Sequence, residues 1–177
     1  MYLHAVQSFV WNHIATKRID AYGSQVIIGD TVQNSSGNVV HVANEEEVKR
    51  YSMADVMLAL PGQQMMYPKT EKVNESTYEQ VLRDLGISNG LAQISFNSPR
   101  ELQLAGSYRA LVIRPQDVHY RLAKYDQEHQ VFFSREGTFP PESDFTTGSN
   151  EALLLSFKLP PGTYATMATR ELLNLGS

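Results

Sequence analysis

The sequence predicts an α+β fold, in which mixed and antiparallel sheets pack with helices. Apolar residues recur at helical spacing near the N-terminus and again near the C-terminus. Between these helices lie short segments that alternate apolar and polar residues and end at Gly or Pro, as β-strands do. Because strands and helices do not alternate strictly, a doubly wound parallel sheet is disfavoured. The 177 residues, 42% of them hydrophobic, suffice for one large domain or two small ones.

The first predicted element is an amphipathic helix over residues 1–22. Its apolar stripe consists of Leu3, Val6, Val10 and Ile14. Lys17 and Arg18 fall in its last turns, where the helix dipole favours cations, and Gly23 ends it. Because no N-cap residue precedes the stripe, we expect the chain to be cut from a longer polypeptide.

Three turn-bounded segments further along the chain predict strands, at residues 26–32, 39–42 and 55–60. The turn-forming residues 34–38 join the first two strands into a hairpin. Downstream, Ser76 and Glu79 form the pattern of a capping box, which predicts a helix from there to Leu85. Gly86 then supplies the C-terminal stop, and Ile87 is placed for the hydrophobic contact that accompanies such stops.

The C-terminal third predicts two more strands, a long loop between them and a final helix. Residues 118–122 alternate as a strand, and residues 126–150 are polar enough to form a long surface loop. The last strand carries on one face Leu153, Leu155, Phe157 and Leu159. The segment 160–162, Pro-Pro-Gly, stops this strand, and Thr163 is placed to cap the helix that follows. Tyr164 lies on the first helical turn, where the pattern alone favours core packing.

The composition excludes several kinds of chemistry. With no Cys there is neither a disulfide framework nor thiol chemistry, which fits a reducing compartment. The five His residues show no metal-ligand spacing, so we expect no metal. No run of about 18 apolar residues exists, so no membrane span is expected. The net charge of −4 gives no support to nucleic-acid binding, because such domains usually carry a basic surplus.

Several short motifs follow one another in a recognisable order over nearly the whole chain. They are HAVQSFVWN at 4–12, GD at 29–30, LPG at 60–62, YP at 67–68, GSYR at 106–109, RPQ at 114–116, FKLPPGTYAT at 157–166 and REL at 170–172. In this order they resemble the TruD family of RNA pseudouridine synthases, especially its eukaryotic branch. The loop at residues 126–150 is the part that the resemblance covers least.

The resemblance implies an insertion domain over residues 1–114 and a return into the catalytic domain over residues 115–177, with the loop at 126–150. It implies an isomerase that converts uridine to pseudouridine in RNA, tRNA foremost, with an aspartate and without a cofactor. The family's motif around that aspartate is missing here, since Asp30, Asp55, Asp84, Asp117, Asp126 and Asp144 sit in other contexts. We therefore expect the chain to be inactive alone and to need an N-terminal catalytic half as its partner.

The resemblance also assigns roles to individual residues. Tyr164 matches the family's active-site aromatic, which makes it the expected contact of the substrate base. Lys17, Arg18, Arg109 and Arg114 are candidate RNA-binding residues, although surface solubility is the favoured explanation of such basic pairs. We expect the protein in the nucleus, the cytoplasm or both, and we expect the isolated chain to self-associate through an exposed apolar face. The alternative is an autonomous adaptor domain that binds RNA or protein without chemistry.

Overall fold

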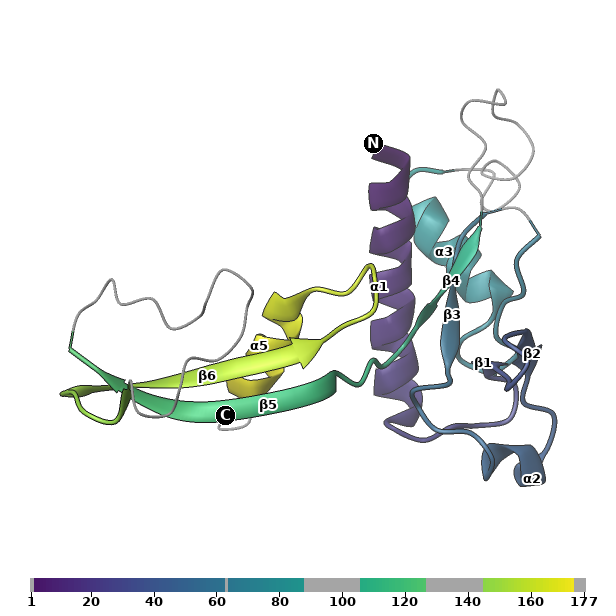
Figure 1. The fold of residues 1–177 in the computed structure, drawn as a ribbon. Coiled ribbons are helices and arrows are strands. Elements are labelled where there is room, and N and C mark those ends of the chain that lie inside the picture. Colours follow the sequence, from purple (N-terminus) through teal and green to yellow (C-terminus); the bar gives the residue numbers. More distant parts are fainter. Residues whose placement is uncertain (1, 63, 88–105, 127–144, 174–177) are drawn as a thin grey trace. The chain divides into compact units, whose positions relative to one another are not determined.

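The computed structural model describes residues 2–62, 64–87, 106–126 and 145–173. These residues form helices and small antiparallel sheets, which confirms the predicted α+β class (Figure 1). The chain divides into two compact units, Met1–Ile113 and Arg114–Ser177. The boundary of the units therefore lies one residue before the boundary that the resemblance implies.

The first unit is built on the helix α1 (Tyr2–Tyr22), as the apolar spacing predicts. Val10 and Ile14 of its stripe are fully buried against β3 (Met57–Leu60) and α3 (Glu75–Asp84). Gly23 adopts a φ of 61° and donates its amide to the carbonyl of Ile19 at 2.7 Å, which ends the helix. The core of this unit thus lies between α1, β3 and α3 (Figure 1).

Two small antiparallel sheets complete the first unit. A hairpin forms around the predicted turn, from β1 (Thr31–Gln33) and β2 (Val39–His41), and the short helix α2 (Glu45–Val48) follows it. The first strand predicted at 26–32 is wrong for residues 26–30, which are not in a strand. β3 pairs with the distant β4 (Ser107–Ala110). A second apolar cluster of Val26, Val32, Val42 and Val56 fills the space beside the hairpin.

The helix α3 ends as predicted but begins differently. Gly86 and Ile87 donate their amides to the carbonyls of Arg83 and Leu82, and Ile87 packs on the core. The N-cap, however, is Asn74, whose side chain accepts from the amide of Thr77 in a capping box. The predicted box at Ser76 is wrong, because Ser76 already lies inside the helix, whereas Asn74 has the extended backbone that a cap requires.

The second unit is an antiparallel hairpin of β5 (Gln116–Tyr125) and β6 (Asn150–Lys158), followed by the helix α5 (Ala165–Leu173) (Figure 1). Residues 127–144 of the predicted loop lie outside the described part of the chain. At the near end of this loop, Asp126 Oδ1 accepts hydrogen bonds from the amide and the hydroxyl of Ser149, both at 2.8 Å. The two ends of the predicted loop are therefore held together by one carboxylate.

The two faces of this hairpin differ in exposure. Ala123 and Leu154 are buried on one face. On the other face Tyr120 and Leu122 are 75% and 70% exposed, although both are large and apolar. Leu153, which pairs with Leu122 in register, is also half exposed. The second unit thus presents an uncovered apolar surface, which we call the bare sheet face.

Candidate functional site

Tyr164 is carried by the connection between β6 and α5. Gly162 adopts a φ of 82°, which glycine reaches without steric cost and which turns the chain after the two prolines. The hydroxyl of Thr163 donates to the carbonyl of Pro160 at 2.6 Å, which closes this turn. The helix begins at Ala165, so the cap position falls on Tyr164 and the predicted cap at Thr163 lies one residue too early. The carbonyl of Tyr164 accepts from the amide of Met167 at 3.0 Å, which starts the helix directly behind it.

Tyr164 is 70% exposed. The pattern of the sequence alone favoured a core position for this side chain, and in this chain that interpretation is wrong. An exposed aromatic ring at the head of a helix, held by a proline-rich turn, offers a flat apolar surface on which a nucleobase can stack.

A charged pair lies at the base of the same connection. Lys158 Nζ is 2.6 Å from Asp117 Oδ2, across the two strands of the hairpin. The hydrogen bond and positive charge of Lys158 hold the pKa of Asp117 below its usual value, and Asp117 in turn raises the pKa of Lys158. Neither residue of this pair was predicted as a site residue. The sequence signal for the pair is the opposite charge of Asp117, near the start of one predicted strand, and Lys158, near the end of the strand that pairs with it.

The basic candidates have three different environments. Lys17 and Arg114 are exposed. Arg109 on β4 is half buried, and its guanidinium carbon lies 5.2 Å from the centre of the Trp11 ring in a cation–π contact. Arg18 is fully buried, so its assignment as an RNA-binding residue is wrong. A guanidinium without exposed surface cannot reach a phosphate.

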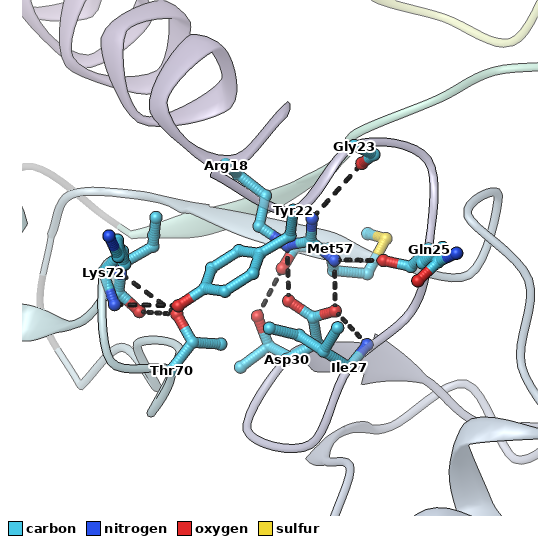
Figure 2. Close-up of polar contacts among 11 residues, drawn as sticks. Arg18, Tyr22, Gly23, Gln25, Ile27, Asp30, Met57, Thr70 and Lys72 are labelled. Carbon is cyan, nitrogen blue, oxygen red and sulfur yellow. Dashed lines mark hydrogen bonds and ion pairs between the residues drawn. The ribbon is translucent and has the colours of Figure 1, made fainter. Parts of the chain in front are cut away.

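Arg18 instead forms a bidentate ion pair with Asp30 inside the first unit. Its Nε and Nη2 atoms lie 2.8 and 2.7 Å from the two carboxylate oxygens, and both side chains have no solvent-exposed surface. Nη2 also donates to the carbonyl of Gln25, and the amide of Ile27 donates to Asp30 (Figure 2). The guanidinium lies over the ring of Tyr22, 5.1 Å from its centre. This network fastens the end of α1 to the loop that follows it.

Neighbouring contacts extend the network to the segment that precedes α3. Tyr22 accepts at its hydroxyl from the amide of Lys72 at 2.9 Å (Figure 2). Gly29 accepts from the amide of Lys69 at 2.7 Å, and a Cβ on Gly29 would lie 2.8 Å from the carbonyl of Lys69. In the motif Gly29-Asp30, the glycine therefore lets the backbone at Lys69 approach closely, and the aspartate pairs with the buried Arg18.

The carboxylates named by the sequence analysis are engaged in local structure wherever the structure describes them. Their partners are Arg18 for Asp30, Ser52 for Asp55, Gln80 for Asp84, Lys158 for Asp117 and Ser149 for Asp126. Asp144 lies outside the described residues, and Asp20 is exposed on α1. Each of the five engaged carboxylates thus has a structural explanation.

The first unit also has an open pocket of about 720 Å³. Its walls include His41, Met66, Tyr67, Lys69 and Glu75. His41 Nε2 donates to the carbonyl of Tyr67 at 2.8 Å, and the amide of Met66 donates to the hydroxyl of Tyr108 at 2.7 Å. Burial raises the pKa of Tyr67, so its hydroxyl stays neutral. The wall of the pocket is thus held in place by side chains from β2 and β4.

Within the described residues, no three His, Asp or Glu side chains gather closely enough to hold a metal ion. None of the helices described is both long and apolar enough to cross a membrane.

A comparison with protein families defines the class of this chain. The model described as "tRNA pseudouridine synthase D (TruD)" matches residues 1–172. The chain belongs to the TruD family. This confirms the resemblance drawn from the short motifs.

Curated relatives agree with this assignment. The chain is 39% identical over 181 residues to "Pseudouridylate synthase 7 homolog" of Bos taurus, and this match covers 99% of the chain and 26% of the relative. The same protein of Homo sapiens is also 39% identical, with the same coverage. "Multisubstrate pseudouridine synthase 7" of Schizosaccharomyces pombe is 30% identical, over 98% of the chain and 29% of the relative. The chain thus spans about a quarter of the length of the relatives it matches.

Proposed function

We propose that the protein to which this chain belongs isomerises uridine to pseudouridine in RNA, with tRNA as the foremost substrate. In this proposal the chain contributes one wall of the active-site cleft and part of the RNA grip. The observation that carries the proposal is the exposed ring of Tyr164, at the position where the family has an active-site aromatic. The match to the family along residues 1–172 supports it.

The reaction explains why an exposed aromatic ring is useful. Pseudouridine formation breaks the bond between uracil N1 and C1′, rotates the base and forms a bond between C5 and C1′. The proton leaves C5 for solvent and N1 gains one, so neither an oxidant nor a cofactor is consumed. The target uridine must leave its stack, which costs a few kcal/mol. Stacking on Tyr164 would recover about 1–3 kcal/mol of that cost.

We assign residues 1–114 to the insertion domain and residues 115–177 to the return into the catalytic domain. The bare sheet face supports the second assignment, because a two-stranded sheet with exposed Tyr120 and Leu122 leaves apolar surface that further strands or helices can bury. Lys17, Arg109 and Arg114 remain candidates for phosphate contacts, whereas Arg18 does not.

The catalytic aspartate is proposed to come from outside this chain. Five of its aspartates hold local structure, as described above, and the family's aspartate motif does not occur in the sequence. The test uses RNA that carries tritium at uridine C5, because isomerisation releases this tritium to water. We expect release by the intact endogenous protein and no release above background by residues 1–177. Release by the isolated chain would show that one of its own aspartates is the nucleophile.

The adaptor function predicts a different outcome in the same assay. An adaptor would be a polypeptide of about the mass of this chain, 19.9 kDa, and would bind RNA or protein without releasing tritium. The enzyme would be several times longer, as the curated relatives are. Measuring the mass of the endogenous protein alongside its tritium release therefore separates the two functions.

A further inference from the structure

The ion pair between Asp117 and Lys158 lies at the end of β6, where the connection that carries Tyr164 begins. Lys158 is the last residue of β6, and it pairs in register with Gln116, the first residue of β5. The register shifts between Gln116 and His119, so the strand has an irregularity of the β-bulge kind at Asp117. Bulges of this kind re-aim a side chain and are common beside active sites.

The backbone of Asp117 is unusual. Its φ is 49°, in the left-handed region that side chains other than Asn and Asp rarely adopt. This conformation and the bulge together bring its carboxylate to 2.6 Å from Lys158 Nζ. The two side chains are 57% and 76% exposed, and pairs with such exposure contribute little to stability. Stability therefore gives no sufficient reason for this backbone conformation at position 117.

The location of the pair suggests another role. Five residues separate Lys158 from Tyr164, and among them are two prolines and Gly162. The Thr163 hydroxyl closes this short connection on Pro160, so the connection has few ways to flex internally. The direction in which Tyr164 points then depends on how the chain leaves β6 at Lys158.

We propose that Asp117 and Lys158 are positioning residues for Tyr164: their ion pair fixes the end of β6 and thereby the place of the Tyr164 ring. This inference rests on the proposed function of Tyr164 as the base-stacking residue. It concerns the reaction step, because a ring displaced by about 1 Å from the flipped base can cost as much as ~10²-fold in rate. Binding of the rest of the RNA does not depend on the pair.

A competing role for Lys158 is direct contact with an RNA phosphate. In that case Asp117 would shield the lysine, and removing the carboxylate would tighten RNA binding. The positioning role predicts a different result for the same variant: kcat falls and KM stays unchanged. The two roles therefore separate in the kinetics of one variant.

The experiment measures tritium release by the intact protein with Asp117→Gly, Lys158→Met and both together. Glycine keeps the left-handed backbone at position 117, so this variant removes the carboxylate without adding strain. We expect roughly 3- to 10-fold lower kcat in each single variant, unchanged KM, and no further loss in the double variant because the two residues act as one unit. Lys158→Arg and Asp117→Asn retain a donor and an acceptor and should restore most of the rate.

The matched control is Lys124→Met. Lys124 faces Glu151 in register at the far end of the same hairpin, so this variant removes another exposed strand lysine, far along the strands from Tyr164. It should leave kcat and KM unchanged. An unchanged kcat in Asp117→Gly, or a lower KM without a change in kcat, would overturn the positioning role.

A second measurement does not depend on activity. In residues 1–177, the heteronuclear NOE of the amides of Thr163 and Tyr164 reports how firmly the connection is held. We expect this NOE to fall in Asp117→Gly and to stay unchanged in Lys124→Met. An unchanged NOE in Asp117→Gly contradicts the inference whatever the activity shows. A wild-type protein that releases no tritium refutes the proposed function, while the NOE still decides the anchoring.

Discussion

Replacing Tyr164 by Ala should separate the two roles that an aromatic residue can have at this position. Tyr164 is 70% exposed, so about 30% of its surface is in contact with protein. With roughly 200 Å² for an aromatic side chain, this is about 60 Å² of apolar surface. At about 25 cal/mol per Å², its loss destabilises the fold by at most ~1.5 kcal/mol. A fully buried aromatic would instead cost about 3–5 kcal/mol.

The effect of Tyr164→Ala on the reaction should be larger than its effect on the fold. Loss of about 1–3 kcal/mol of stacking on the flipped base corresponds to a rate roughly 10- to 100-fold lower at limiting RNA. Tyr164→Phe keeps the π-face and is the matched control, so it should retain most of the activity. The melting temperature of Tyr164→Ala should fall by no more than a few degrees, because the shift is about 2–4 °C per kcal/mol at 150–250 residues and smaller in a longer protein.

The assay is tritium release by the intact protein, with thermal melting measured on the same preparations. A Tyr164→Ala variant that melts many degrees lower, yet turns over normally while folded, would refute the reasoning. It would return Tyr164 to a structural role and remove the one residue of this chain that we place against the substrate.

Three further predictions concern the chain itself. Asp30→Ala leaves the buried guanidinium of Arg18 unpaired and should lower the free energy of unfolding in urea by about 3–5 kcal/mol; a loss below 1 kcal/mol would contradict the buried pair. Gly29→Ala should destabilise more than Gly37→Ala, because both have positive φ but only at Gly29 would a Cβ meet backbone, at 2.8 Å; equal effects would contradict the close approach. In sedimentation the isolated chain should self-associate with increasing concentration, and Leu122→Lys on the bare sheet face should abolish this; a wild-type chain that remains strictly monomeric would argue against an uncovered apolar face.

Local sequence patterns were sufficient where the structure is decided locally. The apolar spacing located α1, and Gly86 with Ile87 located the end of α3, because both features depend on residues within a few positions of one another. The start of α3 was misplaced by two residues, since Ser76 and Asn74 both have cap-forming side chains. Only the backbone conformation distinguishes them.

The errors that bear on function come from contacts distant in sequence. The sequence predicts an exposed Arg18, because arginines near the C-terminal end of a helix usually lie on the surface. Only the loop that returns Asp30 to the end of α1 makes it a buried residue. Likewise, the opposite charges of Asp117 and Lys158 on two pairing strands do not indicate the left-handed backbone at Asp117. The exposure of Tyr164 also depends on the surrounding fold, which the pattern does not contain.

The most direct test of the central claim is to map pseudouridine at nucleotide resolution in the RNA of cells that lack the protein. We expect pseudouridine to disappear from one or more specific sites, with tRNA among the affected RNAs. Wild-type protein and Tyr164→Phe should restore these sites, whereas Tyr164→Ala should restore them poorly at equal protein abundance. A pseudouridine map that is identical with and without the protein would contradict its role as an RNA pseudouridine synthase.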